Sequence, residues 1–424
     1  MKIRSLFTIR HMTQPMSSVF EFTLLLIQVF LVGMLVGGLR VILPAIAESE
    51  YKLFLSSPIL ISTIVLAFGF GKAVFNLVAG FLTTSFSYKR ILIYGWLVGI
   101  PVPFIIAYSS SWVGVSVALT LLGVNQGLNW SITQAAKVQI IKKEHRGHAM
   151  GMNEFFGYVG VAFAGVITAN LVESFTSKNV LMTFSLVIIF LGLLCTIKMH
   201  EKFDSSGSLS KEAAIKSMGH SLSSIGHKFL VVSWQNKRLM ALCQAGFVEK
   251  FIDALVWLFF PIYFLYEGLS IVEVSWVVSC YSFAWGGLQF VTGRLSDVFG
   301  RVPLITAGML ISGVGILLIL VYSGLIWWGC CSLITGLGMA LLYPNLSAAV
   351  ADEVHLVDTS ITLGIYRFWR DLGYAGATLA FAVASYLNPS ITMKFIIVSL
   401  CMLGSTVLLI KNMRSESKTS ARSF

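Results

Sequence analysis

The sequence predicts an all-α integral membrane protein in which twelve transmembrane helices form two pseudo-symmetric six-helix bundles. The 424 residues are 56% hydrophobic and only 12% charged, and the mean hydropathy is +0.84. This balance excludes an ordinary soluble globular domain. The apolar stretches are long enough to cross a bilayer as helices, which takes about 20 residues, and they lack the alternation of a β-barrel strand.

The apolar stretches fall into two sets of six. We expect helices near residues 20–46, 58–82, 91–109, 112–134, 148–171, 180–198, 239–265, 272–293, 302–323, 326–350, 362–386 and 391–410. The longest polar segment predicts an N-terminal bundle over 1–198, a cytoplasmic central loop over 199–238 and a C-terminal bundle over 239–424. The motif Gly-Tyr-Val-Gly at 157–160 recurs as Gly-Tyr-Ala-Gly at 373–376, as expected of a duplicated architecture.

The basic residues are sorted by side of the membrane. Most Lys and Arg lie in loops on one predicted side, whereas the predicted outer loops hold only Lys52 and Lys178. Both termini are therefore predicted to be cytoplasmic, and the net charge of +11 does not indicate nucleic-acid binding. No cleaved signal peptide is expected at the N-terminus. One inner loop is an exception, because its charged residues are the acids Asp352, Glu353 and Asp358.

The central loop contains an amphipathic pattern. Apolar residues recur at helical spacing at Ile215, Met218, Leu222, Ile225 and Phe229. This spacing predicts a helix that lies on the inner membrane surface. A passive tether between the bundles and a docking site for a regulatory partner both fit that pattern.

Cysteine usage gives no indication of a metal site. The six cysteines fall within predicted helices and show no metal-ligand spacing; they are Cys195, Cys243, Cys280, Cys330, Cys331 and Cys401. We expect neither disulfides, nor a metal, nor a cofactor. The sequence also lacks a phosphate-cradling loop and an activated nucleophile, so an enzyme is not expected.

The segment 293–301 reads Gly-Arg-Leu-Ser-Asp-Val-Phe-Gly-Arg and lies between two long apolar stretches. It resembles the signature loop of the major facilitator superfamily of membrane transporters. The resemblance implies the twelve-helix fold of that family, with Gly293 and Gly300 permitting a tight cytoplasmic turn and close helix packing. The implied charge cluster, which breaks when the conformation changes, consists of Arg294, Asp297 and Arg301.

Further charged residues are predicted to form a gate at the cytoplasmic face. The resemblance implies that Asp297 packs near the start of the fifth helix, in the region of Gly147 to Gly151. The repeat aligns Glu154 with Arg370, which predicts opposite charges meeting across the inner mouth. The other predicted gate residues are Arg146, Arg367 and Asp371. The alternative is that Arg367 and Arg370 only extend to the membrane interface.

The seventh predicted helix carries Glu249, Lys250 and Asp253, with Asp253 almost at its midpoint. A charge at the bilayer centre costs about 2.5–3.5 kcal/mol on insertion scales, so such residues are functional candidates. Asp253 is the leading candidate for proton coupling, with Glu249 as the second. The alternative is a fixed structural pair between Lys250 and Asp253.

Polar side chains in other helices predict a substrate pathway. Arg40 and Lys72 would favour an anionic or zwitterionic solute, unless Lys72 pairs internally with Asp253. Amide and aromatic candidates for substrate contact are Asn76, Asn125, Gln126, Asn129, Trp257, Trp285 and Gln289. The alternative for the amides is hydrogen bonding between helices.

Together these features predict a secondary active transporter that moves a small organic solute by alternating access, coupled to protons. We expect a monomer in the lipid bilayer of a bacterial inner membrane. An efflux pump for drugs, metabolites or siderophores shares the fold and remains an alternative. A non-transporting membrane receptor is a further alternative, although it should lack the intramembrane charges that this chain keeps.

The first half departs from the family pattern, because Thr84 stands where the resemblance implies an aspartate after Gly80. The inner lock on that side is therefore expected to be weaker, which favours an inward-facing resting state. Restoring the acid with Thr84→Asp should slow opening on the inner side. The rate at which a thiol reagent labels inner-mouth cysteines measures this, and an unchanged rate would argue against the idea.

Overall fold

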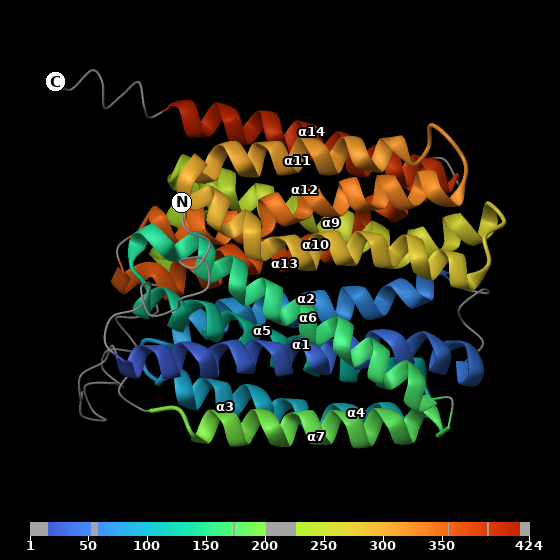
Figure 1. Cartoon of the computed structure of the whole chain (residues 1–424), viewed down its shortest axis with the longest axis horizontal. Coiled ribbons are helices and arrows are strands. Elements are labelled where there is room, and N and C mark those ends of the chain that lie inside the picture. Colours follow the sequence, from blue (N-terminus) through green and yellow to red (C-terminus); the bar gives the residue numbers. More distant parts are fainter. Residues whose placement is uncertain are drawn as a thin grey trace, which may run out of the picture.

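The computed structural model describes residues 16–51, 58–172, 174–200, 226–354, 356–387 and 390–415. Its long helices run side by side along the longest axis of the molecule (Figure 1). The N bundle contains α1 (Met16–Tyr51), α2 (Pro58–Leu82), α3 (Tyr88–Gly99), α4 (Pro101–Tyr108), α5 (Trp112–Ile140), α6 (Arg146–Val172) and α7 (Ser177–Ile197). The C bundle contains α9 (Lys237–Tyr266), α10 (Ile271–Phe299), α11 (Arg301–Leu318), α12 (Leu325–Asp352), α13 (Leu356–Leu387) and α14 (Ile391–Ser415). Short turns, η3 (Lys143–His145) and η5 (Val231–Gln235), precede α6 and α9.

Each of the twelve predicted stretches has a counterpart among the described helices, so the predicted fold class is confirmed. The stretch predicted at 91–109 is divided into α3 and α4 at Ile100. Pro101 follows directly and has no backbone N–H to continue the hydrogen-bond ladder. The two pieces still form one apolar span from Tyr88 to Tyr108.

Eight helical stretches of the described chain are long and apolar enough to cross a membrane. The helices α5, α9, α10 and α13 are not among them. Length is not the reason, because each is longer than α12, which qualifies with 28 residues. These four helices carry most of the buried amides and charged side chains, which lower their hydropathy. The polar residues of the protein are therefore concentrated on a subset of its helices.

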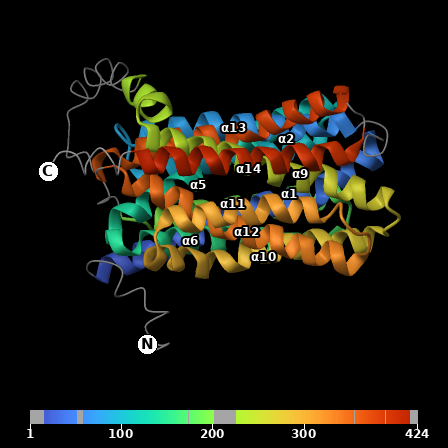
Figure 2. The same cartoon turned by 90° about the horizontal axis from the view of Figure 1, so that it is seen from above.

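The two bundles meet through two helix pairs. Viewed from above, α2 lies beside α13, and α6 lies beside α10 (Figure 2). Glycines allow both pairs to approach closely: the space for a Cβ on Gly80 is only 3.2 Å from Cα of Gly364, and a Cβ on Gly293 would be 2.9 Å from Cα of Gly151. The interface is thus set by contact between backbones.

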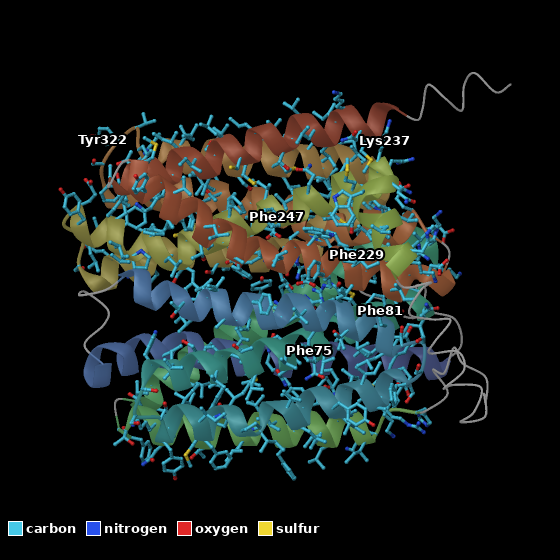
Figure 3. All side chains as sticks on the ribbon, turned by 180° about the vertical axis from the view of Figure 1, so that it is seen from behind. Phe75, Phe81, Phe229, Lys237, Phe247 and Tyr322 are labelled. Atoms are coloured by element: carbon cyan, nitrogen blue, oxygen red, sulfur yellow. The ribbon has the colours of Figure 1, made fainter. Side chains whose placement is uncertain are left out.

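Several predicted features lie at one end of the molecule. Phe229, Lys237 and Phe81 are near the same end, whereas Tyr322 is at the opposite end (Figure 3). In the predicted orientation, the first of these ends is cytoplasmic. The turn between α10 and α11 lies at Gly300, whose φ of 88° is in the left-handed region that glycine adopts readily.

The end of the predicted central loop is attached to the C bundle. Phe229 stacks on Trp369 of α13 with ring centroids 6.2 Å apart, and Trp369 Nε1 donates a hydrogen bond to Ser233 Oγ at 2.9 Å. Most of the predicted amphipathic helix, over residues 201–225, lies outside the described residues, as do the tails at 1–15 and 416–424. The domain boundaries at 199–238 therefore stay a prediction.

Helix packing within the C bundle can be tested at Gly308. A Cβ there would be 2.6 Å from the Gly338 carbonyl oxygen and 2.9 Å from Leu342 Cβ. Gly308→Leu should therefore lower the stability of the C bundle by about 1–3 kcal/mol through overpacking. The matched control is Gly404→Leu, because no atom lies within 4 Å of a Cβ at Gly404. Thermal melts in detergent should show a loss only for Gly308→Leu, and equal melts would refute the packing argument.

Candidate functional site

Asp297, near the end of α10, holds the start of α6. Its carboxylate accepts hydrogen bonds from the backbone N–H groups of Gly147 at 3.0 Å and His148 at 2.9 Å. Because the first N–H groups of a helix have no partner within it, this carboxylate caps α6 and complements its dipole. Arg301 Nη1 lies 2.5 Å from the same carboxylate, whereas Arg294 forms no ion pair with another described residue. The contact between Asp297 and Gly147 that the resemblance implied is present.

The inner loop with acidic in place of basic residues adds further ion pairs to Asp297 and Arg301. Asp352, at the end of α12, pairs with Arg301 Nε at 3.0 Å and with Arg146 Nη1 at 3.2 Å. Glu353 pairs with Arg238 at 2.9 Å. Asp352 therefore connects the start of α6 in the N bundle to α12 of the C bundle. We call Arg146, Asp297, Arg301 and Asp352 the cytoplasmic cluster, after the side of the membrane on which the sequence predicts it.

A second set of charges lies between the bundles at the middle of α13. Asp371 accepts a hydrogen bond from Asn76 Nδ2 at 2.5 Å and pairs with Arg370 Nη2 at 3.1 Å. Lys72 Nζ lies 3.9 Å from the same carboxylate. Asn76 and Lys72 come from α2, so Asp371 joins the two bundles. Internal pairing of Lys72 was the alternative to substrate contact, with Asp253 as an example of a partner, and the structure shows such a pair with Asp371.

Glu154 forms a further contact between the bundles. Its Oε1 accepts hydrogen bonds from three N-bundle side chains, Trp130, Gln134 and Asn153. The Nη2 of Arg367, from α13, lies 3.7 Å from this oxygen. The predicted partner Arg370 was wrong, because it lies one turn later on α13 and pairs with Asp371 instead.

The expected position of Arg367, Arg370 and Asp371 at the cytoplasmic face was also wrong. The helix α13 begins at Leu356, earlier than predicted, and its 32 residues put these side chains near its middle. All three are fully buried, so neither arginine extends to the membrane surface. They belong with Lys72 at the central interface.

The α9 charges form one compact cluster beside that interface. Lys250 Nζ lies 3.3 Å from Glu249 Oε1 and 3.6 Å from Asp253 Oδ2. The hydroxyl of Tyr374, from α13, donates a hydrogen bond to the Asp253 carboxyl. The pairing of Lys250 with Asp253 was raised as an alternative and is present. Lys250 also contacts Glu249, so one ammonium group lies beside two carboxyl groups.

Aromatic rings surround both buried lysines of the central region. Lys250 Nζ lies 4.7 to 5.5 Å from the centres of three rings, those of Trp285, Tyr343 and Tyr374. Lys72 Nζ lies 5.3 Å from the ring of Trp130 and 5.6 Å from that of Phe68. Trp257 is 6.2 Å from Phe68, across the bundle boundary. At these distances the ring faces stabilise the ammonium groups.

Three predicted substrate contacts are directed elsewhere. Asn125 Nδ2 donates to the Gly95 carbonyl oxygen of α3 at 2.8 Å, and Gln126 Nε2 donates to the Val32 carbonyl oxygen of α1 at 2.9 Å. The side chain of Asn129 also packs against Gly95. Asn125 and Gln126 therefore join helices inside the N bundle, which was the alternative interpretation, whereas neither polar atom of the buried Asn129 amide has a hydrogen-bond partner among the described residues.

Trp285 and Gln289 lie one turn apart on the buried face of α10. Trp285 Nε1 and both polar atoms of the Gln289 amide are buried and have no hydrogen-bond partner among the described residues. Because such groups are costly without a partner, both residues fit a site for a polar ligand. The side chain of Arg40 lies outside the described residues.

The sequence alone did not identify several residues of this region. Lys137 was assigned to a loop, but α5 continues past it, and its ammonium is buried, donating to the Leu25 carbonyl oxygen at 3.0 Å and to Asn153 Oδ1 at 2.6 Å. Tyr374 and Tyr343 were not predicted as site residues. The repeated Gly-Tyr motif was the available signal for Tyr374, whereas Tyr343 had none.

No group of three or more His, Cys, Asp or Glu side chains suited to a metal ion occurs within the described residues. The six cysteines are free thiols. The chemical capacity of the central region therefore resides in its ionisable and aromatic side chains.

Comparison with known proteins identifies the family. The profile of the Major Facilitator Superfamily matches residues 25–248 and 242–423. The human organic anion transporter MFSD10 has a TM-score of 0.70 at 17% identity, over 93% of this chain and 100% of that one. The fucose:proton symporter FucP of E. coli, in its outward conformation, has a TM-score of 0.67 at 15% identity, over 93% and 99%. At these identities the likeness establishes the fold alone.

Two curated proteins are similar over short segments. A low affinity ammonium transporter of Saccharomyces cerevisiae is 36% identical over 78 residues, and the efflux pump terJ of Aspergillus terreus is 33% identical over 86 residues. The aligned segments span 18% and 20% of this chain and only 15% and 17% of those proteins.

The cytoplasmic cluster predicts an effect of Asp352→Asn. Loss of this charge removes both bridges to Arg146 and Arg301, so the cytoplasmic ends of the bundles should separate more readily. Thiol labelling of Phe290→Cys, a position at the α6–α10 contact, should become several-fold faster in a background without native cysteines. The control Asp358→Asn removes only the partly exposed pair with Lys228 and should leave labelling unchanged. Equal rates in both variants would contradict the assignment.

Proposed function

We propose, from the premise that this chain belongs to the Major Facilitator Superfamily, that it couples proton movement to the transport of a small anionic or zwitterionic organic solute. The protein is an integral membrane transporter, and its structural neighbours are transporters, not enzymes. The coupling and the solute class are our proposal. In it, the solute occupies the region between the bundles and the bundles rock around it.

The observation that carries the coupling proposal is the pairing of one lysine with two acids. Lys250 is buried between Glu249 and Asp253 at 3.3 and 3.6 Å. Two carboxylates in a low-dielectric site repel each other, and one ammonium neutralises only one of them. A proton shared by this pair removes the uncompensated charge. Asp253 and Glu249 are therefore the proposed proton carriers.

The cytoplasmic cluster is the proposed gate. Gly293 and Gly300 give the α10–α11 turn its shape, and Asp297 holds the start of α6. These pairs are partly exposed, so water can replace them when the bundles separate. The fully buried pairs of Arg367, Arg370 and Asp371 are proposed to respond to the solute and the proton instead.

An exporter is the second candidate function. The segment resemblance to the efflux pump terJ favours it, and import and export use the same cycle in opposite directions. We further propose a monomer in a bacterial inner membrane with both termini in the cytoplasm, in agreement with the sorting of basic residues.

Proton movement in proteoliposomes tests the coupling. An internal pH dye should report proton flux when a transported solute is added, with anionic, zwitterionic and cationic solutes tried in turn. Asp253→Asn should abolish the solute-dependent flux, because the acid pair can no longer release and rebind its proton.

The matched control is Glu267→Gln, which removes an exposed acid at the end of the same helix and should leave the flux unchanged. Undiminished solute-dependent flux in both Asp253→Asn and Glu249→Gln would exclude these residues as the proton carriers.

A further inference from the structure

The buried charges of the central region form two complementary triads. In the first, Lys250 lies between Glu249 and Asp253, which leaves one acid in excess. In the second, Asp371 lies between two cations, Arg370 at 3.1 Å and Lys72 at 3.9 Å, which leaves one cation in excess. Each triad is unbalanced alone, and the two are balanced together. Arg367 pairs with Glu154, which also interacts with Lys137. The Lys137 ammonium is bound by the Leu25 carbonyl oxygen and Asn153 inside the N bundle, so it belongs to neither triad.

The two triads share one aromatic ring. Lys250 Nζ and Arg370 Cζ each lie 4.7 Å from the centre of the Tyr343 ring on α12. The two cations that belong to different triads are therefore neighbours around one side chain. The other titratable and charged groups that act on the first triad are Tyr366, Asp371 and Tyr374 of α13, Lys72 of α2 and Tyr158 of α6.

This arrangement links the binding of a proton to the binding of an anion. When all six charged groups are ionised, the excess acid of one triad offsets the excess cation of the other. A proton on Glu249 or Asp253 removes that offset and leaves one positive charge uncompensated in a low-dielectric region. One monovalent anion restores the balance, whereas a dianion leaves a net negative charge and a cation increases the positive one.

The donors that could receive such an anion are already present. Arg370 Nη1 and Trp285 Nε1 are buried and have no hydrogen-bond partner among the described residues. A guanidinium and an indole N–H suit the oxygens of a carboxylate or sulfonate. The Trp285 ring lies 5.4 Å from Tyr343 and 4.2 Å from Tyr158 of α6, so aromatic faces from both bundles adjoin these donors.

We propose that this region binds one aromatic monovalent oxyanion, a carboxylate or a sulfonate, together with one proton, so that a transport cycle moves no net charge. The inference rests on the proposed function and specifies its solute and stoichiometry. Arg370 and Trp285 bind the oxyanion, the surrounding rings contact its aromatic body, and the first triad holds the proton.

Binding to the full chain in detergent tests the solute class. Benzoate and benzenesulfonate should bind at neutral pH, while benzene-1,3-disulfonate and benzyltrimethylammonium should bind at least about tenfold more weakly because of their charge. In weakly buffered solution, a pH dye should report uptake of about one proton per bound monoanion. Benzenesulfonate stays ionised throughout, so a proton taken up with it belongs to the protein.

Variants separate the two halves of the site. Trp285→Phe keeps an aromatic ring, although a smaller one, and loses the N–H, so it should weaken binding about tenfold with proton uptake per bound anion unchanged. Glu249→Gln with Asp253→Asn should abolish proton uptake. Arg238→Gln, which removes a surface pair with Glu353, serves as the control and should change neither. Arg370→Lys keeps the charge and should still weaken binding, because a single ammonium cannot replace Nε and Nη2 on Asp371 and also the free Nη1 that would donate to the anion.

Transport completes the test. Uptake of benzenesulfonate into proteoliposomes should be equal with and without a membrane potential. Failure of both monoanions to bind, binding without proton uptake, or uptake that depends on potential would overturn the inference. Proton flux driven by another solute, with neither monoanion bound, would leave the proposed function standing and this inference refuted. Monoanion binding with proton uptake but without flux would refute proton-coupled transport and leave the site assignment intact.

Discussion

The carboxylate of Asp371 is the interaction on which the central interface depends. It receives Asn76 and Lys72 from one bundle and Arg370 from its own, and all of these groups are buried. A charge in a low-dielectric region cannot lose its partner without a large desolvation penalty. The bundles therefore cannot separate at this level unless other charges or ligands take over the role of α2. This requirement makes the central interface responsive to its contents.

The contacts between the bundles consequently fall into two classes. The cytoplasmic cluster is partly exposed, so water can hydrate its charges as it opens and each pair contributes modestly. The pairs of Asp371 and Glu154 are fully buried, so their rupture requires a substitute. A solute that supplies this substitute only together with a proton would link the opening of the buried pairs to the opening of the cytoplasmic cluster. The coupling is then a matter of charge balance, without any need for a long mechanical pathway.

The long apolar stretches together with the family resemblance of the segment 293–301 were sufficient to predict the fold, and the same resemblance predicted the contact of Asp297 with α6. The partners inside the bundles were not predictable, because helix periodicity says which residues share a face but not which neighbour that face meets. Asn125 and Asn129 share a face as expected, yet that face meets α3. Lys137 was misplaced for a related reason: a polar stretch at the end of an apolar one reads as a loop, although its ammonium finds acceptors inside the N bundle.

The two sides of the interface are unequal, and the inequality has a consequence for how the bundles move. On the α6–α10 side, the Asp297 carboxylate caps α6 and pairs with Arg301, and Arg146 of α6 pairs with Asp352. On the α2–α13 side, the same end has Tyr88, the first residue of α3, against Ser360 at 3.0 Å, a neutral hydrogen bond. Thr84, in the turn after α2, bonds to the Phe81 carbonyl oxygen and lies 3.4 Å from Ser85 Oγ. Charge-assisted bonds are roughly twice as strong as neutral ones. The α2–α13 side thus depends mainly on Asp371 at its middle, so a change in that charge would release this side first and let the bundles pivot about α6 and α10.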